Sequence, residues 1–178
     1  MKFILSILIF FNFSIAKVYA EETRQVDKHE HGVGELNIAT EGDVIEFEFM
    51  IPGADIVGFE YVAKSDADIA SIRKALQTFE SYENIFTLPT NSRCQLTEKQ
   101  VALKEDEDED DHDDHAEENH NEFYAKYSFE CGDTKAINKI EFPYFSTFPN
   151  SGELEVQFIS SIGSVSYTHL TLPTNREV

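Results

Sequence analysis

Histidines gather in two short clusters of this 178-residue chain, and five of the six histidines belong to them. His29 and His31 form a His-x-His pair, and the other three stand in the acidic run "EDEDEDDHDDHAEENHNEF", residues 105–123. Imidazole nitrogen suits zinc, copper and nickel, whereas calcium and magnesium prefer oxygen ligands alone. The histidines therefore favour a zinc site. The candidate ligands are His29, His31, His112, His115, His120, Asp111, Asp114 and Glu122.

The spacing of the histidines permits metal binding. A His-x-His pair on an extended segment projects both rings to one side, and His112 and His115 share a face if the run turns helical. Neither pair completes a tetrahedral zinc site, which needs four ligands. Two arrangements stay open: the two clusters combine, or carboxylates and water complete each one.

The acidic run also has a simpler interpretation, because blocks of like charge are usually solvated and disordered. We expect residues 105–120 to be disordered without metal. A floppy segment rich in ligands can still capture an ion and order around it. Histidine enrichment favours metal binding, and the alternative function is non-selective binding of cations such as calcium, or an interaction module.

The first 20 residues have the pattern of a secretory signal peptide. Lys2 precedes an apolar run from Phe3 to Ile15, and Val18-Tyr19-Ala20 has the spacing of a cleavage site. The run is shorter than the roughly 20 residues of a transmembrane helix, so we expect a periplasmic protein without stable membrane insertion. The alternative is an uncleaved membrane anchor.

Acidic residues dominate the composition, with 34 Asp and Glu against 14 Lys and Arg and a formal net charge of −20. Such a charge makes nucleic acid a poor partner. The chain contains no zincin His-Glu-x-x-His motif, no nucleophile elbow and no phosphate-binding glycine loop, so we expect no enzyme. A metal held by His29 and His31 could in principle activate water, but nothing specifies a substrate.

Hydrophobic patterning predicts the elements that must position these ligands. Apolar residues alternate over 34–51, as in a hairpin with one wet face, and again over 123–131. Ser65-Asp66-Ala67-Asp68 resembles a capping box and starts an amphipathic helix, about 65–81. A strand begins at Cys94, with a bulge or a turn near 97–100. Residues 136–150 indicate a strand and turn, and 154–158 a further strand.

Two cysteines form an even set in an oxidising compartment, so we expect a disulfide between Cys94 and Cys131. This bond would tie two strands at one end and make residues 105–120 the hairpin loop at the other. The prediction is an α+β fold: a single domain, residues 21–163, with an antiparallel β-sheet, one main amphipathic helix and a disordered acidic His-containing loop. The tail "SVSYTHLTLPTNREV", 164–178, resembles a translated sequencing adapter, so His169 is discounted.

Several segments in combination resemble one family. "HEHGVGELNIA", "IPGADIVGFEY", "CQL", "HNEFYAKYSFEC" and "FPNSGELEVQFISSIG" are similar to the ZrgA-type periplasmic zinc-binding proteins of Gram-negative bacteria, from His29 to about Gly163. The resemblance implies a protein that captures or buffers zinc for an uptake system, with an inner-membrane zinc transporter as partner. It also implies ligand roles for His29, His31 and the histidines of the insertion.

The chain departs from the family pattern in two places. Its insertion is shorter and poorer in histidine, which implies a lower zinc capacity. Tyr61 stands where a histidine commonly follows "GFE", so this position offers no nitrogen ligand. For Glu60 and Tyr61 we therefore favour a structural role over a role in a site.

Overall fold

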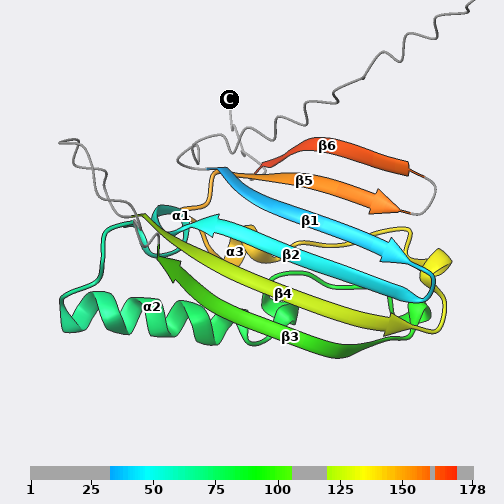
Figure 1. The fold of residues 1–178 in the computed structure, drawn as a ribbon, viewed down its shortest axis with the longest axis horizontal. Helices are drawn as coiled ribbons and strands as arrows, with labels where there is room; N and C mark the ends of the chain where they lie inside the picture. Colours follow the sequence, from blue (N-terminus) through cyan, green and yellow to red (C-terminus); the bar gives the residue numbers. More distant parts are fainter. Residues whose placement is uncertain (1–32, 106–119, 161–162, 172–178) are drawn as a thin grey trace, which may run out of the picture.

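Six strands form one sheet with the order β3-β4-β2-β1-β5-β6 (Figure 1). The computed structural model of the chain describes residues 33–105, 120–160 and 163–171. Neighbouring strands are antiparallel except β1 and β5, which run parallel. The predicted α+β fold is confirmed, with one parallel pair in a mostly antiparallel sheet. The strands are β1 Val33–Glu41, β2 Val44–Pro52, β3 Cys94–Glu105, β4 Asn121–Cys131, β5 Glu153–Ser160 and β6 Gly163–Thr171.

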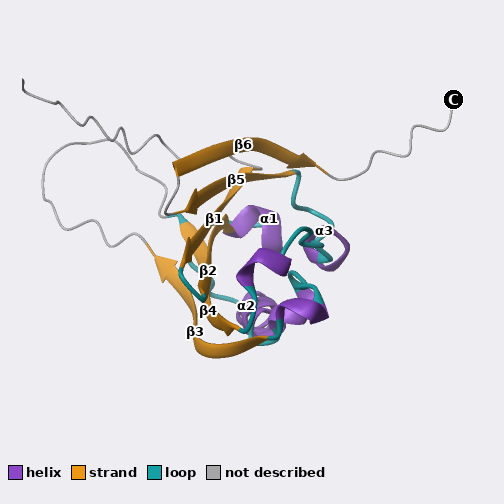
Figure 2. Ribbon diagram, turned by 90° about the vertical axis from the view of Figure 1, so that its right-hand side faces the viewer, coloured by secondary structure: helices purple, strands orange, loops and turns teal. Residues whose placement is uncertain are grey.

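The α-helices of the described residues cover one face of this sheet (Figure 2). They are α1 Gly53–Val57, α2 Asp66–Phe79 and α3 Tyr144–Thr147. The hydroxyl of Ser65 accepts a hydrogen bond from the Asp68 N–H at 3.1 Å, which confirms the predicted start of α2. The helix ends at Phe79, two residues before the predicted end, and a 3-10 turn follows at Tyr82–Asn84.

Alternation along the central strands builds the core. Phe123, Ala125, Tyr127, Phe129 and Cys131 of β4 are all buried, as the sequence pattern predicted. They meet the apolar positions of β2 and an aromatic cluster from the helix-bearing side; the Phe47 and Phe86 rings, for example, stack with centroids 4.1 Å apart. Burial of such large rings is the main favourable contribution to the stability of the domain.

Two connections differ from the predictions. The segment after β2 forms the short helix α1, an element that the hydrophobic patterning did not predict. Residues 136–150 contain α3 and a single β-bridge from Glu141 to Thr87, so the predicted strand there is wrong. Pro143 and Pro149 flank α3, and the chain there packs Tyr144 and Phe148 beneath the sheet, so burial of these rings overrides the strand propensity of the segment.

A hairpin of β3 and β4 brackets the acidic run. The two strands pair from Cys94 with Cys131 to Glu105 with Asn121, with the predicted irregularity between Leu96 and Glu98. The predicted disulfide is confirmed: the sulfur atoms of Cys94 and Cys131 are bonded at the end of this hairpin away from the acidic run. Residues 106–119 therefore connect the two strands at the opposite end, and their predicted disorder lies outside the described residues.

The C-terminal part of the described chain contributes one further strand. Residues 163–171, most of which belong to the adapter-like tail, form β6 and pair with β5. The adapter origin of this tail and the domain boundaries at 20 and 163 stay predictions. Among the residues described, no helix is long and apolar enough to cross a membrane; the predicted signal peptide lies outside them.

Candidate metal-binding site

The structure places two of the eight predicted metal ligands. His120 immediately precedes β4, and Glu122 is the second residue of that strand. The other six, His29, His31, Asp111, His112, Asp114 and His115, lie outside the described residues. Within ranges 33–105, 120–160 and 163–171, no three His, Cys, Asp or Glu side chains gather as a metal-binding group. The described residues thus hold only part of the predicted ligand set.

His120 immediately follows the insertion and contacts a partly buried carboxylate. Its Nδ1 lies 2.8 Å from Oε2 of Glu60. The Glu60 side chain is 12% exposed and the imidazole 39%. One partner of this pair is therefore held inside the protein while the other reaches toward solvent.

The path of the chain after α1 brings Glu60 to this position. Gly58 caps α1 with a φ of 86°, and its N–H donates to the Ala54 carbonyl at 3.0 Å. A left-handed residue at a helix end reverses the chain direction, and glycine adopts this conformation at little cost. The following segment consequently runs past the start of β4, at the end of the sheet where β3 stops (Figure 1).

Asn121 joins this segment to β4 through both its main chain and its side chain. Its backbone N–H donates to the Glu60 carbonyl at 2.9 Å, and its Nδ2 donates to the Tyr61 carbonyl at 3.1 Å. The side chain is only 2% exposed and lies against Gly53, where an added Cβ would come within 1.7 Å of Asn121 Oδ1. The residue next to His120 is therefore fixed in place.

This arrangement has a direct consequence for metal chemistry. A carboxylate that accepts a proton from one ring nitrogen of histidine fixes the tautomer, so that the other nitrogen carries the lone pair. With Nδ1 of His120 facing Glu60, Nε2 is the nitrogen that would coordinate a zinc ion. The Glu60 and His120 side chains thus fit one ligand of a zinc site together with its supporting hydrogen bond.

Sequence reasoning did not find the partnership of Glu60 with His120. The sequence favours a structural role for Glu60, and in the structure its carboxylate contacts a predicted ligand 60 positions away in the chain. The feature of the sequence that could have indicated it is the charged residue Glu60 within the otherwise uncharged "GFEY" segment. Nothing in its spacing indicates which histidine it meets, because that depends on the turn at Gly58.

Glu122 lies in a different setting, on the open face of the sheet, the face that the helices leave uncovered. It sits opposite Lys104 of β3 in the register, and Lys104 Nζ also lies 3.8 Å from the centroid of the Tyr124 ring. The Tyr124 hydroxyl donates to Glu48 Oε1 at 2.9 Å. Burial, followed by this hydrogen bond and the charges of Glu48 and Glu46, raises the pKa of Tyr124 to about 12. Glu122 therefore has a lysine opposite it on β3, and this lysine also contacts the Tyr124 ring.

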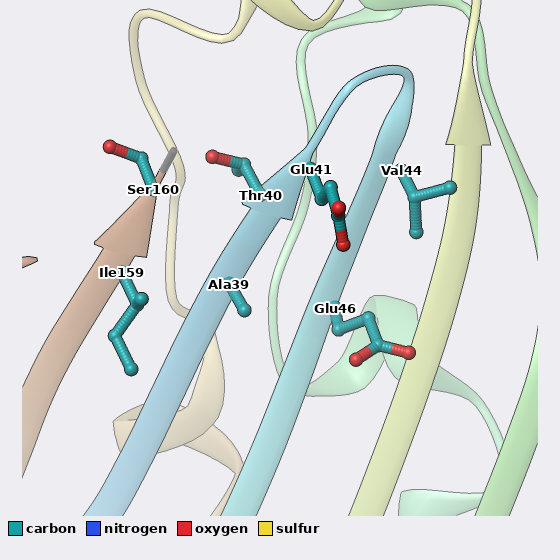
Figure 3. A pocket seen from close by; sticks show the side chains of 7 residues that line it. All are labelled: Ala39, Thr40, Glu41, Val44, Glu46, Ile159 and Ser160. Carbon is teal, nitrogen blue, oxygen red and sulfur yellow. The ribbon is translucent and has the colours of Figure 1, made fainter. Parts of the chain in front are cut away.

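A shallow hollow occupies the other end of the open face, where β1, β2 and β5 approach their turns (Figure 3). Its surface is largely aliphatic, from Ala39, Val44 and Ile159, with the carboxylates of Glu41 and Glu46 at its side. None of its lining residues is a histidine or a cysteine. The hollow lacks the nitrogen and sulfur ligands that select zinc.

Comparison with known protein families gives a match over most of the chain. A family model described as ZrgA family zinc uptake protein matches residues 28–176, which include both histidine clusters and all six strands. No curated protein matches the chain in sequence.

Proposed function

Because the chain belongs to the ZrgA family of zinc uptake proteins, we propose that it is a periplasmic protein that captures or buffers zinc for an uptake system. The proposed ligands are His29, His31 and the histidines and carboxylates of the insertion. The proposed partner is an inner-membrane zinc transporter, to which the protein would present its ion. The proposal includes no catalytic step.

The contact between His120 and Glu60 is the observation that supports this proposal most. It holds one proposed nitrogen ligand directly before β4, at the end of a segment rich in His, Asp and Glu. A fixed first ligand reduces the number of groups that must be ordered when an ion binds, and so lowers the conformational entropy lost on binding. The remaining ligands can then come from residues 106–119.

The ligand types suit a protein that must also release its ion. Zinc binds neutral imidazole, so protons compete with the metal as the pH falls through the usual histidine range of about 6 to 7. Both cysteines are in the disulfide, so the described residues offer no thiolate to zinc. Sites of imidazole and carboxylate hold zinc without the soft thiolate ligands that favour tight, closed structural sites.

The alternative is a non-selective acidic module that binds calcium or other cations, favoured by the net charge of −20. Replacement of His112, His115 and His120 by Asn separates the two functions. Zinc affinity should fall while calcium affinity hardly changes if imidazoles are ligands. Equal losses for both ions would favour the alternative.

Calorimetric titration of zinc into the oxidised, exported protein tests the proposal directly. The second sample is a variant lacking residues 105–120, and the third carries His29→Asn with His31→Asn. Saturable binding that weakens on deletion would support capture by the insertion. Undiminished binding would move the site to the first histidine pair and the folded domain, and absence of binding in the unaltered protein would contradict zinc capture altogether.

A further inference from the structure

We propose that Glu60 is a positioning residue for zinc binding: its carboxylate accepts the Nδ1 proton of His120 and thereby presents Nε2 to the ion. This inference rests on the proposed zinc capture and assigns a role to a residue that the ligand chemistry of the sequence did not select. It makes the segment after α1 part of the metal site, although that segment donates no ligand.

The geometry of the pair supports a role in orientation. The Nδ1 to Oε2 distance of 2.8 Å is that of a strong hydrogen bond. Because the Glu60 side chain is only 12% exposed, this bond is less screened by water than an ion pair between two surface groups. The ring, at 39% exposure, keeps access to solvent from which an ion arrives.

Main-chain atoms already supply the structural connection between these two segments. The Glu60 carbonyl accepts from the Asn121 N–H, and the Tyr61 carbonyl accepts from Asn121 Nδ2. Neither bond involves the Glu60 carboxylate, so replacing this side chain leaves both in place. The carboxylate can therefore be tested for its effect on His120 with the position of the segment preserved.

Asn121 also helps to hold Glu60 and His120 in position relative to each other. It is adjacent to His120 in the chain and hydrogen-bonded to the carbonyl of Glu60 itself. The backbones of the two partners are thus held by a contact one residue away from the ring. A histidine oriented in this way needs little rearrangement when it coordinates a metal.

Partners of this kind typically change metal affinity by about 10- to 100-fold when they are removed. We therefore expect Glu60→Ala to weaken zinc binding by about 10- to 100-fold in the oxidised protein. Glu60→Gln keeps an oxygen that can accept the Nδ1 proton, so it should lower zinc affinity less than Glu60→Ala does. The control is Glu130→Gln, which removes one charge at the end of β4 distant from His120. This change should leave zinc affinity within about twofold, the range of a single screened surface charge.

A double-mutant cycle with His120→Asn distinguishes orientation from direct ligation. If Glu60 acts through His120, Glu60→Ala should have little further effect once the imidazole is absent. A full additional loss in the His120→Asn background would overturn the inference and make Glu60 a ligand itself. Unfolding of each variant in metal-free denaturant verifies that the domain remains intact.

Nitrogen NMR of the His120 ring gives a readout that a purely structural role would not change. At a pH where the metal-free ring is neutral, we expect the proton on Nδ1 in the unaltered protein and a shift of the population toward Nε2 in Glu60→Ala. An unchanged tautomer together with unchanged zinc affinity would overturn the role of Glu60 but leave zinc capture standing. Absence of zinc binding by the unaltered protein would instead contradict the proposed function itself.

Discussion

Gly53 and Asn121 determine how closely α1 approaches the start of β4. An ideal Cβ at position 53 would lie 1.7 Å from Asn121 Oδ1 and 2.6 Å from the Phe59 carbonyl oxygen. Contacts this short cannot be relieved by moving a flexible side chain, because one of the two atoms belongs to the backbone. Glycine is needed here for space, and the same contact keeps Asn121 next to His120 in place.

We predict that Gly53→Ala destabilises the domain by about 1–3 kcal/mol, the usual cost of forcing extra volume into a packed site. Denaturant unfolding followed by circular dichroism measures this change. Gly42→Ala is the matched control, since a Cβ there meets no atom within 4 Å and only the cost of its positive φ is expected. A loss at position 53 no larger than at position 42 would contradict the close packing.

Buried phenols give the protein a stability limit at high pH. Tyr127 is fully buried and its hydroxyl donates to the Phe79 carbonyl at 2.6 Å; burial, then the charges of Glu80 and Glu83, raises its pKa. Burial likewise raises the pKa of Tyr144, with a further increase from Asp55. Above a pH of about 10 the unfolded chain loses these protons while the folded chain keeps them, so the stability present below pH 10 is lost as pH rises.

We predict that Tyr127→Phe makes the decline above pH 10 shallower, by up to about 1.4 kcal/mol per pH unit, because one such proton no longer distinguishes the two states. At neutral pH the same change should cost about 1–3 kcal/mol, since it leaves the Phe79 carbonyl without the hydroxyl that it accepts from. Urea unfolding at a series of pH values measures both quantities. Parallel declines for the two proteins would contradict the assigned effect of burial.

Among the strands and helices, those with a strong local pattern could be predicted from the sequence. Strict alternation assigned the two faces of β4, and Ser65 with Asp68 located the start of α2. Residues 136–150 misled the prediction because their aromatic side chains serve burial beneath the sheet, which β propensity does not distinguish from a strand. The contact of Glu60 with His120 joins positions 60 residues apart, and no local pattern encodes such a pair.

We expect the disulfide to contribute more to the stability of the β3–β4 hairpin than any single bond contributes to another pair of strands. β3 is an edge strand with many exposed residues, and Cys94–Cys131 closes a loop with a sequence separation of 37. The chain-entropy estimate for a loop of this length is about 4 kcal/mol. This bond also limits how far the two strands can separate, although the insertion between them is rich in Asp and Glu.

We predict that Cys94→Ser with Cys131→Ser lowers the free energy of unfolding by about 2–4 kcal/mol. Because β3 pairs with β4 alone among the described strands, hydrogen exchange should rise more in β3 than in the central strands β1 and β2. Amide exchange by mass spectrometry resolves the strands, and denaturant unfolding gives the total. A uniform rise in exchange across the sheet would contradict a local role for the bond.

At the scale of the whole molecule, the protein combines a sheet covered by helices on one face with an excess of negative charge. The net charge of −20 attracts any cation, and this attraction is long-ranged and independent of ligand type. Coordination by imidazole acts only at contact distance and selects zinc over calcium. The two contributions are therefore separable by salt, which screens the first much more than the second.

We predict that raising ionic strength from about 0.1 M to about 1 M, which shortens the Debye length from roughly 10 Å to roughly 3 Å, weakens calcium binding much more than zinc binding. The salt must be one whose anion does not bind zinc, and calorimetry with each ion gives the two salt dependences. In a variant with Asn in place of His29, His31, His112, His115 and His120, the residual zinc binding should become as sensitive to salt as calcium binding, because the carboxylates then supply the attraction without the proposed imidazole ligands. Equal sensitivity of both ions in the unaltered protein would mean that its charge alone attracts zinc, and that the histidines, including the one held by Glu60, add no selectivity.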